Sequence, residues 1–493
     1  MTSAALPGVS LTFERAATGD EPLRTDVAVF LGRTRRGPVG EAVRVESWND
    51  VVGAFGPPDG TSATPYALRG FFENDGRTAW VLRVSGPAEP ASAQWTDDYS
   101  VVAASPGAWA NGARVSVRYR ASSVAGPPAV TVRVLVPGEP AEIFAGLAPG
   151  EVADRLTASR LVRLVPSGPE GPASPIPPDA PLSMAWDLTL TGGTDSPPGR
   201  AEYTSAVTAQ AELPEPALVA LPDLGADLTG DDHLDLVLTL LGVVAPLLDR
   251  LVLLDVPPNL STVDQVLGWA GALADFGDAA LLSAAAVYHP PLRAPSLEGP
   301  GLRTVPASGH VAGLVARLDA ERGAAHTPAN ATLLDAVDLE VEYPEPQLLR
   351  LFDANVDLVR CVRGRGLVVW GGRTLSGDPH RRYVAHRRLL HLLVRAIRRA
   401  AAPLVFEVNS PELRLALVRA TTSVLLEAFR TGALAGSRPE DAFRVVCDES
   451  NNPPEQDPGQ VVCEIDVAPG VPMEFIRLRL VLGQDRGLEV IEQ

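Results

Sequence analysis

The feature that most constrains the fold of this chain is a regular alternation of strand-like and helical segments between Ala217 and Trp370. Apolar stretches such as Leu251 to Leu254 and Gly366 to Trp370 are separated by helical stretches such as Ser261 to Phe276. Strands that alternate with helices in this way build a largely parallel sheet covered by helices. The sequence therefore predicts an α/β layered domain, with further strands at Ala217 to Leu221 and Ala279 to Tyr288.

At 493 residues the chain is too long for one ordinary hydrophobic core, so several domains are expected. An N-terminal stretch mixes strands with helices at Trp48 to Phe55 and Tyr66 to Asn74, and a β-rich stretch with a Pro- and Gly-rich insert follows. The predicted fold class is a multidomain α/β and α+β protein. Its predicted parts are an N-terminal arm (1–22), an N-terminal mixed α/β region (23–96), a β-rich outer domain (97–200), the α/β domain (201–376), a C-terminal α+β domain (377–482) and a C-terminal arm (483–493).

The C-terminal domain begins with an amphipathic helix from Val384 to Ala400. Opposite its apolar side lies a basic face, which consists of Arg388, Arg395, Arg398 and Arg399 together with His391. This face is either a solvated surface or a contact for an acidic surface of another protein, and both interpretations stay open. After the helix, the pattern predicts a strand at Leu404 to Val408, a helix at Pro411 to Thr431, and strands at Phe443 to Asp448, Val461 to Val467 and Phe475 to Leu482.

Both ends of the chain carry short strand-like segments outside these domains. Val9, Leu11 and Phe13 alternate with polar residues near the N-terminus, and Leu488 and Val490 do so near the C-terminus. An isolated strand is not stable without a partner strand. We therefore predict two unpaired terminal strands that serve as arms.

Composition excludes several classes of function. The chain contains no lysine, so all 42 basic residues are arginine, and neither a P-loop nor a pyridoxal Schiff base can form. A net charge of −18 repels nucleic acid and anionic lipid. The N-terminus lacks the pattern of a secretory signal, and the longest apolar run, Leu236 to Leu248, is shorter than the roughly 20 residues of a membrane span. These features predict assembly in the cytoplasm, without nucleic-acid partners or membrane insertion.

No motif for catalysis, cofactor binding or metal binding stands out. The odd number of cysteines without C-x-x-C spacing argues against a disulfide framework and against zinc: Cys361, Cys447 and Cys463. The histidines show no metal-ligand spacing. Ser308, His310 and Asp319 lack the geometry of a triad, and the glycines at Gly364 and Gly366 fit a tight turn better than a dinucleotide site. We predict no catalytic, cofactor-binding or metal-binding residues.

A series of short motifs along nearly the whole chain resembles the contractile tail sheath proteins of myophages, pyocin-like particles and extracellular injection systems. The motifs follow the family order and are Pro7-Gly8-Val9, Phe30-Leu31-Gly32, Arg36-Gly37-Pro38-Val39, Ser47-Trp48, Tyr66 to Asn74, Ser105 to Asn111, Leu190 to Asp195, Ser308 to Gly313, Pro328-Ala329-Asn330, Trp370 to Leu375, Asp378-Pro379, Arg382-Tyr383-Val384, Arg387-Arg388-Leu389 and Cys447 to Pro454. Each motif is weak alone, but their common order makes the resemblance specific.

The resemblance implies a structural protein rather than an enzyme, with a subtilisin-like sheath fold that lacks a catalytic triad. It implies stacked hexameric rings around an inner tube, which contract to drive the tube through a target envelope, with baseplate and cap proteins as further partners. It also implies that the two terminal arms add strands to a neighbour's sheet, with Phe475 to Leu482 in the receiving sheet. The basic face would then contact the tube or another subunit.

Several alternatives stay open. A subtilisin-like hydrolase would need Ser, His and Asp in separate strand-end loops, and no motif supplies them. A tube protein or a baseplate adhesin is a third reading, although a tube subunit is usually a much shorter β-barrel protein. The machine is either a phage tail, a released particle or a device that stays in the cytoplasm, and the sequence does not separate the extended from the contracted state.

Overall fold

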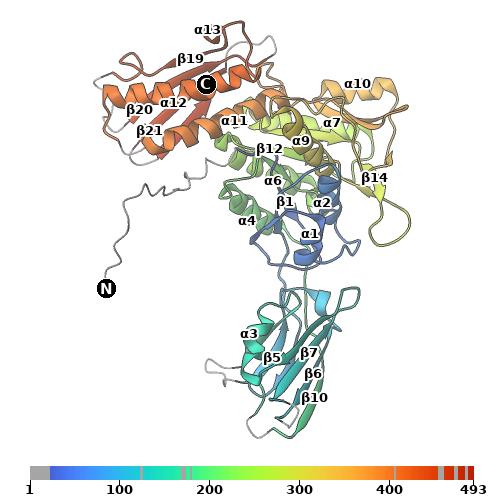
Figure 1. The fold of residues 1–493 in the computed structure, drawn as a ribbon. Coiled ribbons are helices and arrows are strands. Elements are labelled where there is room, and N and C mark those ends of the chain that lie inside the picture. The colour runs from blue at the N-terminus through green and yellow to red at the C-terminus, as the bar shows by residue number, and fades with distance from the viewer. Residues whose placement is uncertain are drawn as a thin grey trace, which may run out of the picture.

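The computed structural model describes residues 23–122, 126–167, 174–177, 180–404, 407–453, 460–470, 476–483 and 487–492. Three bodies follow one another in Figure 1: a C-terminal body at one end, a central α/β body, and a β-rich body at the other end. The predicted N-terminal arm, with Val9, Leu11 and Phe13, lies outside the described residues.

The central body is built on an eight-stranded sheet. In spatial order its strands are β18 (Gly366–Trp370), β17 (Val356–Val362), β13 (Ala285–His289), β12 (Leu251–Asp255), β11 (Leu218–Ala220), β1 (Ala28–Gly32), β3 (Ala79–Arg83) and β2 (Ala42–Val45). The six inner strands run parallel, and β18 and β2 close the two edges with antiparallel pairs. The prediction of a largely parallel sheet is confirmed.

Strands from two distant parts of the sequence share this sheet. β1 pairs in parallel with β3 on one side and with β11 on the other, so strands from residues 28–83 and strands from residues 218–370 form one sheet rather than two separate units. The β-rich body is inserted between β3 and β11. The sequence pattern assigned these ranges to different units because this insertion separates their strands along the chain.

Helices cover both faces of the sheet and create two hydrophobic cores. One core contains residues of α1 (Trp48–Phe55), α2 (Thr64–Glu73) and α9 (Ser308–Arg322). The other contains residues of α4 (Arg200–Ala211), α5 (Leu224–Asp227), α6 (Gly230–Val244), α7 (Val263–Phe276), α8 (Ala279–Leu282) and α10 (Glu345–Asp353). Because successive strand residues point to opposite faces, inner strands such as β12 are apolar on both faces, here from Leu251 to Leu254.

The motif at the start of α9 has a packing role. A Cβ atom on Gly309 would lie 2.3 Å from the backbone oxygen of Ala67, and one on Gly313 would lie 2.3 Å from that of Phe71. Only glycine therefore allows α9 to approach α2 this closely. His310 is buried at the same contact, beside Gly70.

The β-rich body has its own core, formed between two antiparallel sheets and a short helix, α3 (Val152–Leu156). One sheet contains β10 (Ser183–Thr189), β6 (Arg114–Arg120), β7 (Ala129–Leu135) and β8 (Glu142–Leu147), and the other contains β4 (Ser92–Thr96), β5 (Tyr99–Ala103) and β9 (Val162–Pro166). The predicted β-rich character of the insert is confirmed.

A small third sheet of β15 (Leu302–Val305), β14 (Leu292–Pro295) and β16 (Asp338–Leu339) belongs to the central body.

The C-terminal body packs two long helices against a four-stranded antiparallel sheet. The helices are α11 (Val384–Ala401) and α12 (Pro411–Arg430), with a short α13 (Pro439–Ala442), and the strands are β19 (Phe443–Val446), β20 (Gln460–Val467), β21 (Ile476–Gly483) and β22 (Gly487–Glu492). Within the described residues, no helix is long and apolar enough to cross a membrane.

Two predicted strands are wrong in part or in whole. The first half of Ala279 to Tyr288 forms α8, because Asp278 caps it by accepting the Leu281 N–H at 2.8 Å and alanine favours helix. Only its second half is strand β13. At Leu404 to Val408 a 3₁₀ turn ends at Leu404, and Glu407 and Val408 are not in a strand.

Candidate functional site

The basic face of α11 lies largely inside the chain. The Arg388 guanidinium donates hydrogen bonds to both carboxylate oxygens of Asp319 on α9, and their side chains are only 3% and 4% exposed. It also donates to the backbone oxygen of Thr25 at 2.8 Å. A buried, two-pronged ion pair of this kind is strongly destabilising to break, because one charge is left without its partner.

Arg395 and Arg398 make further contacts with backbone oxygens of the same chain. Arg395 donates to Arg24 O at 2.8 Å, to Glu215 O at 3.0 Å and to Pro216 O. Burial lowers the pKa of Arg395 to about 10. Arg398 donates to Leu247 O at 2.7 Å.

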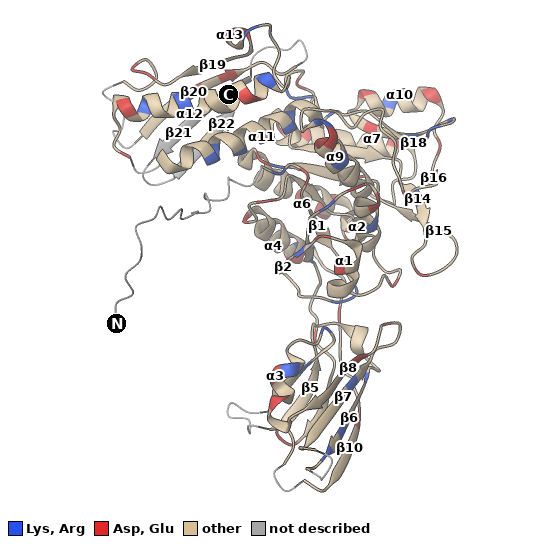
Figure 2. Ribbon diagram, viewed as in Figure 1, with Lys and Arg blue, Asp and Glu red and all other residues tan. Residues whose placement is uncertain are grey.

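The basic face therefore joins the C-terminal body to the central body. Figure 2 shows basic positions along α11, which runs between the C-terminal sheet and the central body. Arg388, Arg395 and Arg398 are engaged within this chain, and only Arg399 of the four predicted residues is exposed. The apolar side of the same helix packs on the C-terminal core, so α11 is buried on two sides. The solvated-face interpretation thus fails for Arg388 and Arg395.

The same arginines hold residues 24 and 25, which follow the predicted N-terminal arm (1–22) in the sequence. Thr25 donates its hydroxyl hydrogen to Asp319 at 2.6 Å, while the backbone oxygens of Arg24 and Thr25 accept from Arg395 and Arg388. The root of the predicted N-terminal arm is thus held beside α11. Sequence reasoning missed Thr25, and it considered Asp319 only as a triad member, because no local pattern joins residues so far apart in the chain.

The C-terminal strand is paired within its own chain. β22 forms an antiparallel ladder with β21, in which Leu482 faces Leu488 and Leu480 faces Val490. Val490 is buried at 2% exposure in the C-terminal core. The prediction that this end is unpaired is therefore wrong for the chain alone, since β21 offers an adjacent strand edge.

The three residues weighed as a catalytic triad have other partners. The Ser308 N–H donates to Asp255 at 2.9 Å, and Asp319 is bound by Arg388 and Thr25. His310 is buried, with one ring nitrogen 3.3 Å from the backbone oxygen of Asp335. These residues stabilise helix ends and domain contacts.

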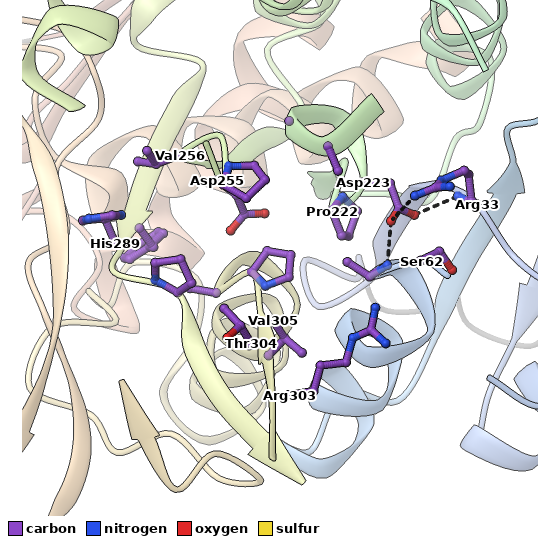
Figure 3. Close-up of a pocket in the computed structure, with 18 of the residues that line it drawn as sticks. Arg33, Ser62, Pro222, Asp223, Asp255, Val256, His289, Arg303, Thr304 and Val305 are labelled. Carbon is purple, nitrogen blue, oxygen red and sulfur yellow. Dashed lines mark hydrogen bonds and ion pairs between the residues drawn. The ribbon is translucent and has the colours of Figure 1, made fainter. Parts of the chain in front are cut away.

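A cavity of about 260 Å³ lies at the carboxyl ends of β11, β12 and β13, where α/β enzymes bind their ligands. Figure 3 shows Asp223, Asp255 and His289 around it. Asp223 accepts the backbone N–H groups of Arg33, Ala63 and Thr64 as well as the Thr64 hydroxyl, and so caps α2.

Two other groups line the cavity: His289 is buried, and Asp255 is partly buried with one carboxylate oxygen shielded from solvent. Burial raises the pKa of Asp255 to about 7 and lowers the pKa of His289 to about 4. Asp255 accepts the N–H of Ser308 at the start of α9, and His289 lies 2.9 Å from the Tyr343 hydroxyl. The carboxylates at this edge thus serve as helix caps, and in the described part of the chain no group of three His, Cys, Asp or Glu side chains could hold a metal.

Two family models match adjoining parts of the chain. The model described as phage tail sheath protein central domain matches residues 201–375, and the one described as phage tail sheath C-terminal domain matches residues 376–483. Together they cover more than half of the chain.

Two curated relatives match in sequence. The tail sheath protein of Enterobacteria phage T4 is 29% identical over 184 residues, covering 36% of this chain and 27% of that protein. The tail sheath protein of Vibrio phage KVP40 is 31% identical over 184 residues, covering 36% of this chain and 26% of that protein. The match spans about a quarter of the length of these relatives.

Solved structures match over almost the whole chain. The sheath tail protein of Listeria innocua superposes with a TM-score of 0.67 at 14% identity, covering 93% of this chain and 95% of that one. That of Desulfitobacterium hafniense gives 0.64 at 15% identity, covering 97% and 100%. The contracted helical sheath of the anti-feeding prophage gives 0.56 at 20% identity, covering 96% and 98%. At these identities the likeness shows a common fold.

Proposed function

This chain belongs to the phage tail sheath family, and on that premise we propose that it polymerises as stacked hexameric rings around an inner tube and contracts to drive that tube through a target envelope. Its family and its structural, non-enzymic character are confirmed by the sheath models and the curated sheath relatives. The observation that carries the proposal is the unbroken match of two sheath domain models over residues 201–483.

For the fold, we propose that the central body is a subtilisin-like domain without protease function. The support is that the residues at its strand and helix ends cap helices or bind other parts of the chain. Asp255 holds the start of α9, and Asp319 holds Arg388 and Thr25. A covalent serine-hydrolase probe should therefore leave the protein unlabelled.

For assembly, we propose that terminal arms pass between neighbouring subunits and add strands to the C-terminal sheet. Two observations favour this. Arg388 and Arg395 hold residues 24–25 at the root of the N-terminal arm. β22 lies at one edge of the four-stranded sheet, and among the described residues no strand pairs with its outer side. In the polymer, β22 would leave β21 of its own chain for a neighbour's sheet.

For contraction, we propose that the rigid bodies rotate while the arms keep neighbours linked. Main-chain hydrogen bonds of an added strand tolerate rotation of the rigid bodies, whereas side-chain contacts between subunits do not. The interfaces between subunits would then be the two-state element that releases free energy. Of the four predicted residues of the basic face, Arg399 stays a candidate for contact with the tube or a neighbouring subunit.

We further propose that the partners are other copies of this chain, the inner tube, and baseplate and cap proteins. Nucleic acid is not expected among them, because the net charge of −18 opposes phosphate binding. Assembly would begin in the cytoplasm, and the particle would either stay there or leave as a tail or injection device.

Negative-stain electron microscopy of the overexpressed protein tests the assembly proposal. We expect striated hollow tubes from the full chain, and only small oligomers from variants that lack residues 1–15 or residues 487–493. Leu182→Ser is the matched control, because Leu182 is 80% exposed in the β-rich body and should not affect tubes. Monodisperse monomers from every variant, the full chain included, would overturn the polymer proposal.

A further inference from the structure

Two of the three cysteines lie close together: Cys463 is in β20, Cys447 directly follows β19, and their thiols interact. β19 and β20 pair with Val446 opposite Glu464, so the next pair in register is Cys447 and Cys463. Both are buried in the C-terminal core, at 8% and 0% exposure, and both are free thiols in this structure. The separation of Cys447 and Cys463 along the chain gave no sign of this pairing.

The ladder places the two cysteines at a position suited to a disulfide. The Ala468 N–H donates to Ala442 O at 2.8 Å, so Ala442 and Ala468 form a hydrogen-bonded pair. Hydrogen-bonded and non-hydrogen-bonded pairs alternate along an antiparallel ladder. Continuing this alternation one position past Val446 and Glu464 makes Cys447 and Cys463 a non-hydrogen-bonded pair, for which Cα atoms are typically about 4.5 Å apart. This spacing lies at the short end of the range of about 4.4–6.8 Å that disulfides span.

A side-chain clamp holds the two positions in register. The Asn452 amide donates to Val462 O at 2.8 Å, and its oxygen accepts the Val462 N–H at 2.6 Å. The same amide reaches back to Asp448 O at 3.1 Å. The residues next to each cysteine are therefore tied to each other, which limits how far the thiols can separate.

The two thiols also differ in how readily they ionise. The hydrogen bond from the Cys463 thiol, aided by the nearby charge of Arg414, lowers the pKa of Cys447. The same contact, together with burial, raises the pKa of Cys463. Cys447, which is also the more exposed of the two, is therefore the thiol that reacts first.

We propose that Cys447 and Cys463 are a latent cross-strand disulfide that forms when the protein meets a peroxide outside a reducing compartment. The Cys447 thiolate attacks one peroxide oxygen, which forms a sulfenic acid and releases the other oxygen as water. The Cys463 sulfur then attacks the sulfenic sulfur, which forms the S–S bond and releases a second water. Together the two thiols lose two electrons, and one hydrogen peroxide is reduced to two waters.

The expected consequence is a stiffer C-terminal sheet. The bond would lock β19 to β20 and close the loop that begins with the Asp448 to Asn452 segment. If this sheet receives strands from neighbours, which rests on the proposed function, the disulfide would stabilise it after a particle leaves the cell. The chemistry itself does not depend on assembly.

The test uses the full-length Cys361→Ser variant, because Cys361 is exposed and would otherwise form bonds between molecules. After hydrogen peroxide treatment we expect a mass decrease of about 2 Da, loss of both alkylatable thiols, and a cross-linked peptide pair containing Cys447 and Cys463. The melting transition of the C-terminal body should rise by about 5 °C, and dithiothreitol should reverse every change.

Cys361→Ser/Cys463→Ala is the matched control. It should accumulate a sulfenic acid on Cys447 that dimedone traps, without the mass decrease. Two thiols that stay alkylatable after peroxide treatment of Cys361→Ser, or Cys447 that goes directly to sulfinic acid there, would overturn the proposal even if the control fails to fold. Because tube formation is not measured in this test, the disulfide proposal and the sheath proposal can fail independently of each other.

Discussion

The central sheet and the C-terminal sheet bury their strands in different ways. The central sheet has helices on both faces, and the antiparallel strands β2 and β18 close its edges within one chain. The C-terminal sheet packs on α11 and α12 and ends at β22, the last described strand of the chain. Both sheets thus end in an edge strand, β2 or β22, whose outer side pairs with no other described strand. They differ in how helices cover their faces and in that β22 is the last described strand.

The two bodies meet where the arginines of α11 bind Asp319 and the backbone around Thr25. A helix that is apolar on one side and basic on the other is usually read as half exposed. Here both sides are buried, one by apolar packing and one by charged hydrogen bonds. The junction therefore depends on a few buried polar contacts, whereas each sheet depends on its own apolar core.

The largest expected effect is at this junction. Arg388→Met should lower the free energy of unfolding by about 3–5 kcal/mol, because Asp319 is left buried without its partner. Chemical denaturation measures the loss, and faster hydrogen exchange near residue 25 would place it at the junction. Arg399→Met, at the exposed residue of the same basic face, should change stability by less than about 0.5 kcal/mol. Equal losses in both variants would refute the buried junction.

The next effect tests the rigid packing of the central body. Gly309→Ala should destabilise it by about 3 kcal/mol, because the added Cβ meets the Ala67 backbone rather than a side chain that can move. Gly268 in α7 has open space around its Cβ position, so Gly268→Ala should stabilise by about 0.5–1 kcal/mol. Thermal unfolding of both variants compares them, and a neutral Gly309→Ala would show that α9 can move away from α2.

A smaller effect concerns pH, and it should be confined to the central body. The pKa of Asp255 is raised to about 7, so between its unfolded value of about 3.9 and 7 the folded state holds a proton that the unfolded state lacks. Its contribution to stability is therefore lost as pH rises through this window, by about 2 kcal/mol between pH 5 and 7. His289, with its pKa lowered to about 4, acts in the opposite direction and destabilises the fold as pH falls below about 6.5.

Asp255→Asn removes the contribution of Asp255 to the pH dependence of stability and keeps that of His289. Urea denaturation of this variant should show a smaller fall in stability as pH rises from 5 to 7, and what remains of the fall would come from other carboxyl groups with a raised pKa, Asp227 and Asp357. The native protein, measured in parallel, should lose stability over that same rise relative to the variant. If the variant and the native protein showed the same change in stability from pH 5 to 7, Asp255 would be ionised throughout this range.

The smallest effect belongs to the edge of the C-terminal sheet. Val490→Ala should cost about 1.5 kcal/mol, since two buried carbon groups of β22 are lost, and the cost should appear only in the C-terminal body. Val165, which is 43% exposed in the β-rich body, offers Val165→Ala as a near-neutral control. A loss of stability in the central body after Val490→Ala would contradict the independence of the two sheets.

Local patterns in the sequence predicted five of the longer helices and several strands well, but they did not predict α4, α6, α9 or α10. The helix at Trp48 to Phe55 and the strand at Gly366 to Trp370 have the predicted bounds, and α11 extends one residue past its predicted end. The error at Ala279 to Tyr288 arose because an apolar run of alanine and leucine fits both a helix and a strand, and a cap at Asp278 decided between them.

The candidate sites were harder to predict than the elements. The arginines of α11 were correctly singled out by their spacing, but their partners Asp319 and Thr25 lie far away in the sequence. Helical spacing tells which residues share a face, and it does not tell what covers that face. Likewise, the strand at Leu488 and Val490 was recognised, while its pairing with β21 was not predicted, because a strand pattern does not identify the partner strand.

The sequence by itself determined many of the elements, the parallel α/β class and the family, because periodicity and motif order are local properties of the chain. Only the tertiary structure decided that β1 joins β11 across the β-rich insertion, that the basic face of α11 is an internal junction, and that Cys447 meets Cys463. These contacts join residues distant in sequence, and their free energy comes from burial and pairing that exist only after the chain has folded.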